Sequence, residues 1–300
     1  MTADESAAVL HLVDAAATSD GVSPLSEHVL LHLRYGGDLQ ARNVLLHVGS
    51  ELAGYAHLDP TDPVEGPSGE LVIHPGYRRH GHGLTLLRAL LAEADGRPLR
   101  LWAHGDAPAA TRLAQAAGFE RIRALWQMRR SLAAPIDQPR YPEGVTVRTF
   151  AVGQDETPWL ELNRRAFASH PEQGGWTSED IALREREPWF DPEGFFIAER
   201  GGRLVGFHWT KIHGGQGSSA GSSSGHGHDV IGEVYVVGVD PGERGTGLGR
   251  ALTLRGLHYL RSRELSQVML YVDEANTPAI RLYESLGFSH WATDVMFRHP

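Results

Sequence analysis

The chain repeats one pattern of landmarks, and this internal repeat constrains its fold more than any other feature. A strand-like segment ends in a proline, and six residues later a glycine opens a helix-like run: Pro75 and Gly81 in the first half, Pro241 and Gly247 in the second. A Gly-Phe pair then follows these glycines after 37 residues in the first half and 40 in the second. Three landmarks at nearly matching spacing indicate two copies of one structural unit.

Paired strand-like segments precede each glycine-rich turn. Residues 44–48 and 52–57 predict a hairpin closed by Gly-Ser, and residues 195–199 and 204–211 predict one closed by Gly-Gly. Each copy is therefore expected to run strand, helices, hairpin, long strand, glycine-rich turn, helix, strand, helix and strand. This order is typical of a mixed α/β fold.

The boundary between the copies is predicted from a proline-rich stretch. We expect an N-terminal domain at residues 1–134, a linker at 135–144 that holds three prolines, and a C-terminal domain at 145–300. A Gly/Ser/His tract at 214–228 makes the second copy longer between its strands. Such a tract buries no core and is expected to form a loop.

Composition excludes several classes of protein. The 300 residues include no cysteine, which rules out disulfides, a cysteine nucleophile and a thiolate metal site, and fits a cytoplasmic location. The net charge is −9 and no basic stripe is visible, so we expect no nucleic-acid partner. No apolar run approaches the roughly 20 residues of a membrane-spanning helix, so no membrane partner is expected either.

The glycine-rich turns predict an anion site. Both read Arg-x-x-Gly-x-Gly between a strand and a helix, at residues 78–83 and 244–249. The N–H groups of a first helical turn have no partner within the helix and attract phosphate oxygens. The spacing matches neither the dinucleotide fingerprint nor the P-loop, so a purely structural turn remains an equal alternative from this motif alone.

Further residues give the turns a family context. Residues 276–288 read Asn-x-x-Ala-x-x-x-Tyr-x-x-x-Gly-Phe, and together with the turn this resembles the GNAT N-acetyltransferase superfamily. Residues 170–176, 187–192, 206–211 and 232–241 are most similar to the mycothiol synthase family, whose members carry two such domains. The resemblance implies an α/β (α+β) fold of two tandem GNAT acyltransferase domains, each with a mixed, mostly antiparallel central sheet flanked by helices.

The resemblance also implies a reaction. That family transfers the acetyl group of acetyl-CoA, its co-substrate, to the cysteinyl amine of cysteinyl-glucosaminyl-inositol, the last step of mycothiol biosynthesis. No metal is needed for this chemistry. We expect a monomer that binds this small-molecule amine. Two alternatives stay open: an acetyltransferase for another amine, such as a protein N-terminus, a polyamine or an aminoglycoside, and a CoA-binding sensor without turnover.

Two side chains of the second half fit the catalytic roles. The amine must lose a proton before it attacks a thioester, and the leaving thiolate benefits from one. Glu233 stands at the start of the strand that ends at the second turn, and the family match makes it our candidate general base. Tyr283 lies one helical turn before Gly287 and is our candidate general acid. From position alone, an exposed strand-end carboxylate and a core tyrosine are the competing interpretations.

The first half keeps the spacing but not these side chains. Ala114 stands where the second half has Tyr283, and only Glu70, displaced by a few residues, offers a carboxylate near the position of Glu233. We therefore expect an N-terminal domain that is catalytically degenerate and whose backbone still binds acetyl-CoA.

Binding residues follow from the motifs and the resemblance. In the second half the predicted cofactor-binding residues are Val237, Gly238, Val239, Arg244, Gly245, Thr246, Gly247, Leu248, Gly249, Arg250, Asn276, Ala279 and Arg281. In the first half they are Leu71, Val72, Ile73, Arg79, His80, Gly81, His82, Gly83 and Leu84. For the acceptor, the resemblance implies Glu27, Glu172, Lys211, Glu233 and Tyr271.

Other conspicuous residues are given structural roles. Trp102, Trp126 and Trp291 are expected in the core, and the pair Arg129 and Arg130 at a solvated strand end.

Overall fold

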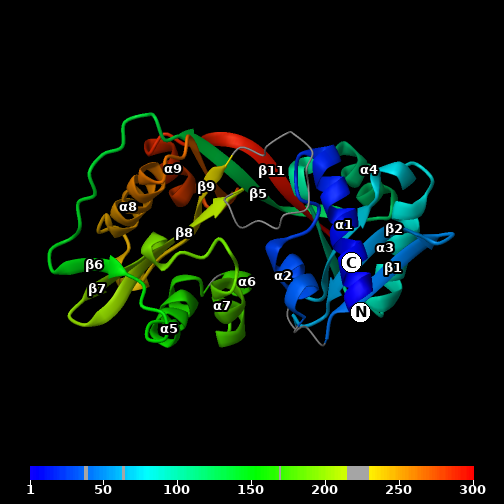
Figure 1. The fold of residues 1–300 in the computed structure, drawn as a ribbon, viewed down its shortest axis with the longest axis horizontal. Coiled ribbons are helices and arrows are strands. Elements are labelled where there is room, and N and C mark those ends of the chain that lie inside the picture. Colours follow the sequence, from blue (N-terminus) through cyan, green and yellow to red (C-terminus); the bar gives the residue numbers. More distant parts are fainter. Residues whose placement is uncertain (37–39, 63–64, 169, 215–229) are drawn as a thin grey trace. The chain divides into compact units, whose positions relative to one another are not determined.

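The computed structural model describes residues 1–36, 40–62, 65–168, 170–214 and 230–300, and of residues 171 and 172 only the backbone (Figure 1). The predicted loop at 214–228 lies outside the described residues except for Gly214. The chain forms two compact units. Unit 1 comprises Met1–Trp126, Asp273–Ala275 and Ala292–Pro300, and unit 2 comprises Gln127–Val272 and Asn276–Trp291.

Unit 1 has a sheet in the order β1-β2-β3-β4-β11-β5. Its elements are α1 (Ala3–Asp20), α2 (Glu27–Tyr35), β1 (Arg42–Val48), β2 (Glu51–Asp59), β3 (Ser68–Ile73), η1 (Pro75–Tyr77), α3 (His82–Glu93), β4 (Leu99–Ala103), η2 (His104–Asp106), α4 (Pro108–Ala116), the first part of β5 (Glu120–Ser131) and the last part of β11 (Ser289–His299).

Unit 2 has a sheet in the order β11-β5-β10-β9-β8-β7-β6. Its elements are the last part of β5, β6 (Val145–Thr149), α5 (Glu156–Ala166), α6 (Pro171–Gly174), α7 (Ser178–Glu185), η3 (Pro192–Gly194), β7 (Phe195–Arg200), β8 (Arg203–His213), β9 (Ile231–Val239), η4 (Pro241–Glu243), α8 (Leu248–Ser262), β10 (Gln267–Asp273), α9 (Thr277–Ser285) and the first part of β11.

The repeat is confirmed at the level of the backbone. Gly81 and Gly247 both begin their helices with positive φ, 85° and 88°, a conformation that glycine adopts without strain. The two hairpins match as well, because each has a glycine within its second strand, Gly54 in β2 and Gly206 in β8. A Cβ atom on Gly54 would lie 3.0 Å from Leu86, and one on Gly206 would lie 2.8 Å from Leu252. The absence of a side chain at each glycine therefore lets the strand pack closely against its helix.

The compact units differ from the predicted boundaries. The last residues of β11, Val295–His299, pair antiparallel with Leu99–Ala103 of β4, which makes the C-terminus part of unit 1. Conversely, residues 127–144 belong to unit 2. As limits of the two sequence copies, 1–134 and 145–300 remain a prediction. The compact units depart from them because backbone hydrogen bonds join strands that are far apart in the chain.

One predicted strand is absent. The expected order began each copy with a strand, and β6 fills that place in unit 2. In unit 1 the first described element is the helix α1, from Ala3, and not a strand, so the prediction was wrong there.

Helices cover both faces of each sheet. In unit 1, Val9 and Val29 of α1 and α2 pack on Tyr55, while Leu86 of α3 packs on Ala56 at the opposite face. In unit 2, α5 and the segments after it bury an aromatic cluster, whose fully buried members are Trp159, Phe195, Phe207 and Trp209. Phe195 and Trp209 stack with centroids 4.4 Å apart, and such pairs contribute about 1 kcal/mol each beyond burial. Helix α8 covers the other face of that sheet.

No helix within the described ranges is both long and apolar enough to cross a membrane.

Candidate active site

The glycine-rich turn of unit 2 begins a long helix without a side-chain cap. Gly245 and Gly247 have φ values of 80° and 88°, and a Cβ atom on either would meet nothing within 4 Å. Gly247 is the N-cap of the 15-residue helix α8 and supplies no side-chain hydrogen bond to it. The first N–H groups of α8 therefore face open space with the positive end of the helix dipole behind them. These features fit the diphosphate of CoA.

Unit 1 contains the same turn with one strained residue. Gly81 begins α3 without a side-chain cap, as Gly247 begins α8. Arg79 takes the place of Gly245 and has a φ of 67°, which costs a residue with a Cβ atom about 1 kcal/mol. The two turns therefore share a backbone geometry, and binding of acetyl-CoA at the first one stays a prediction.

The arginines that open the two turns are both anchored to protein. Arg244 donates to the carbonyl of Ala166 at the end of α5, 3.1 Å away. Arg78 makes two hydrogen bonds to Asp20 at the end of α1, at 2.7 and 2.8 Å. Arg250 donates to Ser285 and Asp137. In this structure Arg244 and Arg250 brace the turn and its helix, and their predicted contact with phosphate is a proposal.

The strands that lead into the turns each have an open edge. β9 pairs with parallel β10 only from Gly232 to Val234, and β3 pairs with β4 only at Ser68 and Gly69. The segments 237–239 and 71–73 therefore have no register pair with that parallel neighbour, and a pantetheine arm along this edge stays a prediction. Gly238 also has a packing role, since a Cβ atom there would lie 2.5 Å from the ring of Phe207.

Glu233 lies buried on β9 beside two polar side chains. It stands directly opposite Lys211 of β8, and its Oε2 atom lies 2.6 Å from Nε2 of His213. Its side chain is 9 % exposed, whereas that of His213 is 34 % exposed. His213 was missed in the sequence. Its only signal there is the alternation of Trp209, Lys211 and His213 along one strand face.

Aromatic rings hold the cations of this region. The Nζ atom of Lys211 lies 4.4 Å from the ring centroid of Trp189 and 5.1 Å from that of Tyr235. Arg184 stacks over Trp176 at 3.8 Å and donates to the hydroxyl of Tyr235 at 2.7 Å. Such cation–π contacts help to fix the positions of the two cations.

Tyr283 is buried in α9, where its ring packs against Phe288. Burial raises its pKa to about 12, which keeps the phenol protonated at neutral pH. A protonated phenol is what a general acid requires. Asn276 caps the same helix, because its side chain accepts a hydrogen bond from the N–H of Ala279. Arg281 is exposed, whereas Ala279 is half-buried.

Three of the predicted acceptor residues share one face of the sheet in unit 2. Lys211 and Met269 are the register partners of Glu233 on either side, and Tyr271 follows Met269 by two residues. Glu27 begins α2 in unit 1. The backbone of Glu172 lies in α6, and its side chain is outside the described residues.

Unit 1 has neither predicted catalytic side chain. Ser68 pairs with Asp59 in unit 1, and Glu233 pairs with Lys211 in unit 2. Asp59 lies five residues after Gly54 and Lys211 lies five residues after Gly206, so Ser68 occupies the position of Glu233. The sequence had allowed Glu70 to replace Glu233. The register shows that this was wrong, and Glu70 instead accepts a hydrogen bond from the N–H of Ser26.

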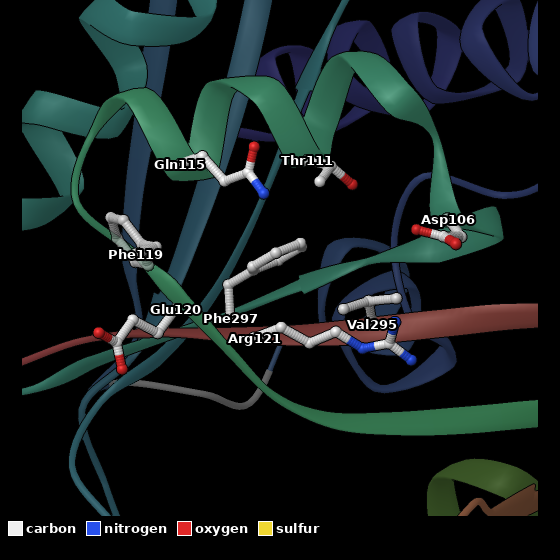
Figure 2. Close-up of a pocket in the computed structure, with 8 residues that line it drawn as sticks. All are labelled: Asp106, Thr111, Gln115, Phe119, Glu120, Arg121, Val295 and Phe297. Carbon is white, nitrogen blue, oxygen red and sulfur yellow. The ribbon is translucent and has the colours of Figure 1, made fainter.

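Two hollows in unit 1 lie apart from these residues. One, of about 410 Å³, separates α4 from β5 and β11, with Thr111 and Gln115 facing Phe297 (Figure 2). The other, of about 630 Å³, lies over Asn43 and Tyr55. No residue predicted for catalysis or binding lines either one.

Two other expectations for side chains were wrong. Trp291 is 62 % exposed and not in the core. Arg130 is buried and donates to the carbonyl of Leu286. Within the described part of the chain, no group of three or more His, Cys, Asp or Glu side chains is arranged to hold a metal ion.

Two units of this kind, each with a parallel strand pair that leads into a glycine turn and a helix without a side-chain cap, have the architecture of a tandem acyltransferase. The sequence profile of the acetyltransferase (GNAT) family matches residues 15–119 and 158–288. The chain therefore belongs to the GNAT acetyltransferase family and is an acyltransferase. Acetyltransferases of this family use acetyl-CoA as their co-substrate.

Named relatives match nearly the whole chain. The mycothiol acetyltransferase of Thermobispora bispora is 62 % identical over 297 residues, covering 99 % of this chain and 97 % of that protein. That of Streptosporangium roseum is 58 % identical over 331 residues, covering 98 % and 96 %. A solved tandem GNAT protein from the clavulanic acid biosynthesis pathway shares the fold, with a TM-score of 0.74, 21 % identity and coverage of 100 % and 96 %.

Proposed function

We propose that the chain acetylates the cysteinyl amine of cysteinyl-glucosaminyl-inositol with acetyl-CoA, giving mycothiol, and that unit 2 carries the chemistry. The small-molecule acceptor is supported by the relatives named mycothiol acetyltransferase, which match along nearly their full length. The assignment to unit 2 is supported by Glu233 and Tyr283, whose counterparts in unit 1 are a serine and an alanine.

The reaction combines one acyl transfer with proton transfers from the amine nitrogen and to the leaving sulfur. The carboxylate of Glu233 takes a proton from the acceptor ammonium, and the freed nitrogen lone pair attacks the thioester carbon. The tetrahedral intermediate then expels the CoA thiolate as its C–S bond breaks. Tyr283 gives its phenolic proton to that sulfur, the proton left on the amide nitrogen returns to the phenolate, and Glu233 releases its own proton to solvent. The open backbone edge at Val237–Val239 offers N–H groups to the thioester oxygen.

The contact between Glu233 and His213 carries this proposal. A buried carboxylate needs a hydrogen-bonding partner, and an imidazole 2.6 Å away fixes one oxygen while the other remains for the amine. Lys211 lies across from Glu233, with its Nζ atom over the rings of Trp189 and Tyr235. In our proposal it binds hydroxyl or carbonyl oxygens of the acceptor.

The test measures release of the CoA thiol with cysteinyl-glucosaminyl-inositol as acceptor. Glu233→Gln keeps the shape of the side chain and removes its basicity, so turnover should fall by roughly 100-fold or more. Tyr283→Phe should also lower turnover. Glu284→Gln, which alters an exposed carboxylate on α9, is the control and should match the parent enzyme.

A panel of amines separates the alternatives. A preference for a polyamine, an aminoglycoside or a peptide N-terminus would replace the acceptor, and no release with any amine would indicate a CoA-binding sensor. Unchanged turnover in Glu233→Gln would remove Glu233 from the role of base.

We further propose that unit 1 binds acetyl-CoA at residues 71–73 and 79–84 without turning it over. The uncapped helix after Gly81 supports this. Calorimetric titration with acetyl-CoA should give two sites per chain, and a single site that is lost in a variant of the second turn would contradict it.

A further inference from the structure

Four polar and aromatic side chains form a continuous ledge on the sheet of unit 2. The hydroxyl of Tyr271 on β10 accepts a hydrogen bond from Nε2 of Gln127 on β5, at 2.8 Å. Oε1 of Gln127 accepts one from Nε of Arg129, at 2.9 Å. The guanidinium of Arg129 lies 4.5 Å from the ring centroid of Trp291 on β11. The ledge is defined as Tyr271, Gln127, Arg129 and Trp291.

The ledge presents an aromatic surface to solvent. Trp291 is 62 % exposed and Tyr271 is 38 % exposed. Indole has the largest apolar surface of any side chain, and leaving it in water forgoes stabilisation that burial would give. Arg129 layers over the ring and Gln127 ties Arg129 to Tyr271, so the indole is braced from its own sheet rather than left loose.

The ledge starts at the acceptor residues and runs away from the predicted base. Glu233 is in register with Met269, and Tyr271 lies two residues further along the same face of β10. The strand order from Glu233 to Trp291 is β9, β10, β5 and β11. Three strand spacings of about 4.8 Å place Trp291 about 14 Å across the sheet from Glu233.

We propose that Trp291, Arg129 and Gln127 form a subsite for a polyhydroxylated ring of the acceptor. This inference rests on the proposed function, because it assumes that the amine lies at Glu233. An amine joined through an acyl arm to two linked six-membered rings is long enough to reach across the sheet to the indole. The flat face of the indole suits the C–H face of such a ring, and Arg129 offers N–H donors to its hydroxyls, while the buried Gln127 holds Arg129 in place.

The chemistry of the ledge favours a neutral polyol over other occupants. The guanidinium of Arg129 supplies N–H donors in a fixed geometry, but it also stacks on the indole. The ledge as defined has no second cation that would help to bind a phosphate. The same donors match hydroxyl oxygens without requiring a charge on the ligand.

The test compares two acceptors in steady-state kinetics. One is cysteinyl-glucosaminyl-inositol, and the other is cysteinyl-glucosamine, which lacks the outer ring. Trp291→Ala should raise KM for the longer acceptor roughly tenfold, leave its kcat within a factor of two, and change KM for the shorter acceptor little. Trp291→Phe keeps an aromatic face and should recover part of the loss. Val152→Ala, which trims an apolar side chain 52 % exposed outside the ledge, is the matched control and should leave both KM values unchanged.

The outcomes separate this inference from the proposed function. If Glu233→Gln abolishes turnover of both acceptors while Trp291→Ala leaves both KM values unchanged, the base stands and the subsite is wrong. If Trp291→Ala instead raises KM for acetyl-CoA alone, the indole belongs to the co-substrate. A change in oligomeric state in Trp291→Ala, with unchanged kinetics, would make the ledge a contact between copies and also overturn the proposal.

Discussion

Replacing Asp294 with asparagine tests whether a buried charge cluster holds the last strand in unit 1. Asp294 on β11 accepts hydrogen bonds from Nδ1 of His104, at 3.0 Å, and from the N–H of Gly105, at 2.8 Å. On the other side of the imidazole, Oε1 of Glu70 lies 3.9 Å from Nε2. The side chains of His104 and Asp294 are only 14 % and 11 % exposed. The cluster therefore contains an imidazolium between two carboxylates.

The charge of His104 determines how much stability the substitution of Asp294 costs and how that cost depends on pH. Burial by itself lowers the pKa of His104, but the hydrogen bond to Asp294 and the charges of Asp294 and Glu70 outweigh it and raise the pKa to about 10. Removing one partner of a buried ion pair costs about 3–5 kcal/mol. Asparagine keeps an oxygen for one of the two donors, so we expect a loss of about 3 kcal/mol in the free energy of unfolding near pH 6.

The sign of the pH dependence follows from the raised pKa. Stabilisation by protonated His104 is complete below its ordinary pKa of 6.5 and is lost as the pH rises through about 10. The difference between the parent protein and Asp294→Asn should therefore be largest at pH 6 and shrink toward pH 10.

Hydrogen exchange gives a local readout for this variant. The backbone amides of β4 and of Val295–His299 should lose protection in Asp294→Asn, in parallel with the shift in urea unfolding. Asp137→Asn is the control. It breaks an ion pair with Arg250 in which the carboxylate is 75 % exposed, and should cost less than about 1 kcal/mol. Equal effects of the two substitutions, or a difference that grows with pH, would refute the reasoning.

Three further predictions concern unit 2. In Gly256→Ala the new Cβ atom would lie 2.0 Å from the ring of His208, so urea unfolding should show a loss of at least about 3 kcal/mol, and parent-like stability would contradict this packing. Burial and the neighbouring Glu156 raise the pKa of Glu185 to about 7, so stability should decline as the pH rises from 4.5 to 7. Glu185→Gln should remove that decline in stability, which should amount to less than about 1 kcal/mol because Glu185 is partly exposed. Thermal melts across this pH range measure the decline, and an unaltered profile in the variant would exclude the raised pKa. His213→Gln should lower kcat several-fold with KM for the acceptor unchanged and should shift the pH profile of kcat, whereas an effect on KM alone would make His213 a binding residue.

Local sequence patterns were sufficient to predict the repeated elements of this fold. Glycines with positive φ, the hairpin turns and the Gly-Phe pairs act within a few residues, so the repeat, both hairpins and both glycine-rich turns were readable before any tertiary contact was known. The spacing of Arg-x-x-Gly-x-Gly likewise identified the helix starts that face open space, because the requirement for glycine there is a property of the backbone.

Only the tertiary structure decided which strands complete each unit and which side chains meet. Val295–His299 joins β4 because backbone hydrogen bonds are indifferent to distance along the chain, and no local pattern marks the partner. The contacts of Glu233 with His213, of Asp294 with His104 and of Trp291 with Arg129 arise from register and from strand order. A shift of one residue in β9 would turn Glu233 to the other face, and the sequence, which fixes which residues can form a strand, does not by itself fix that register.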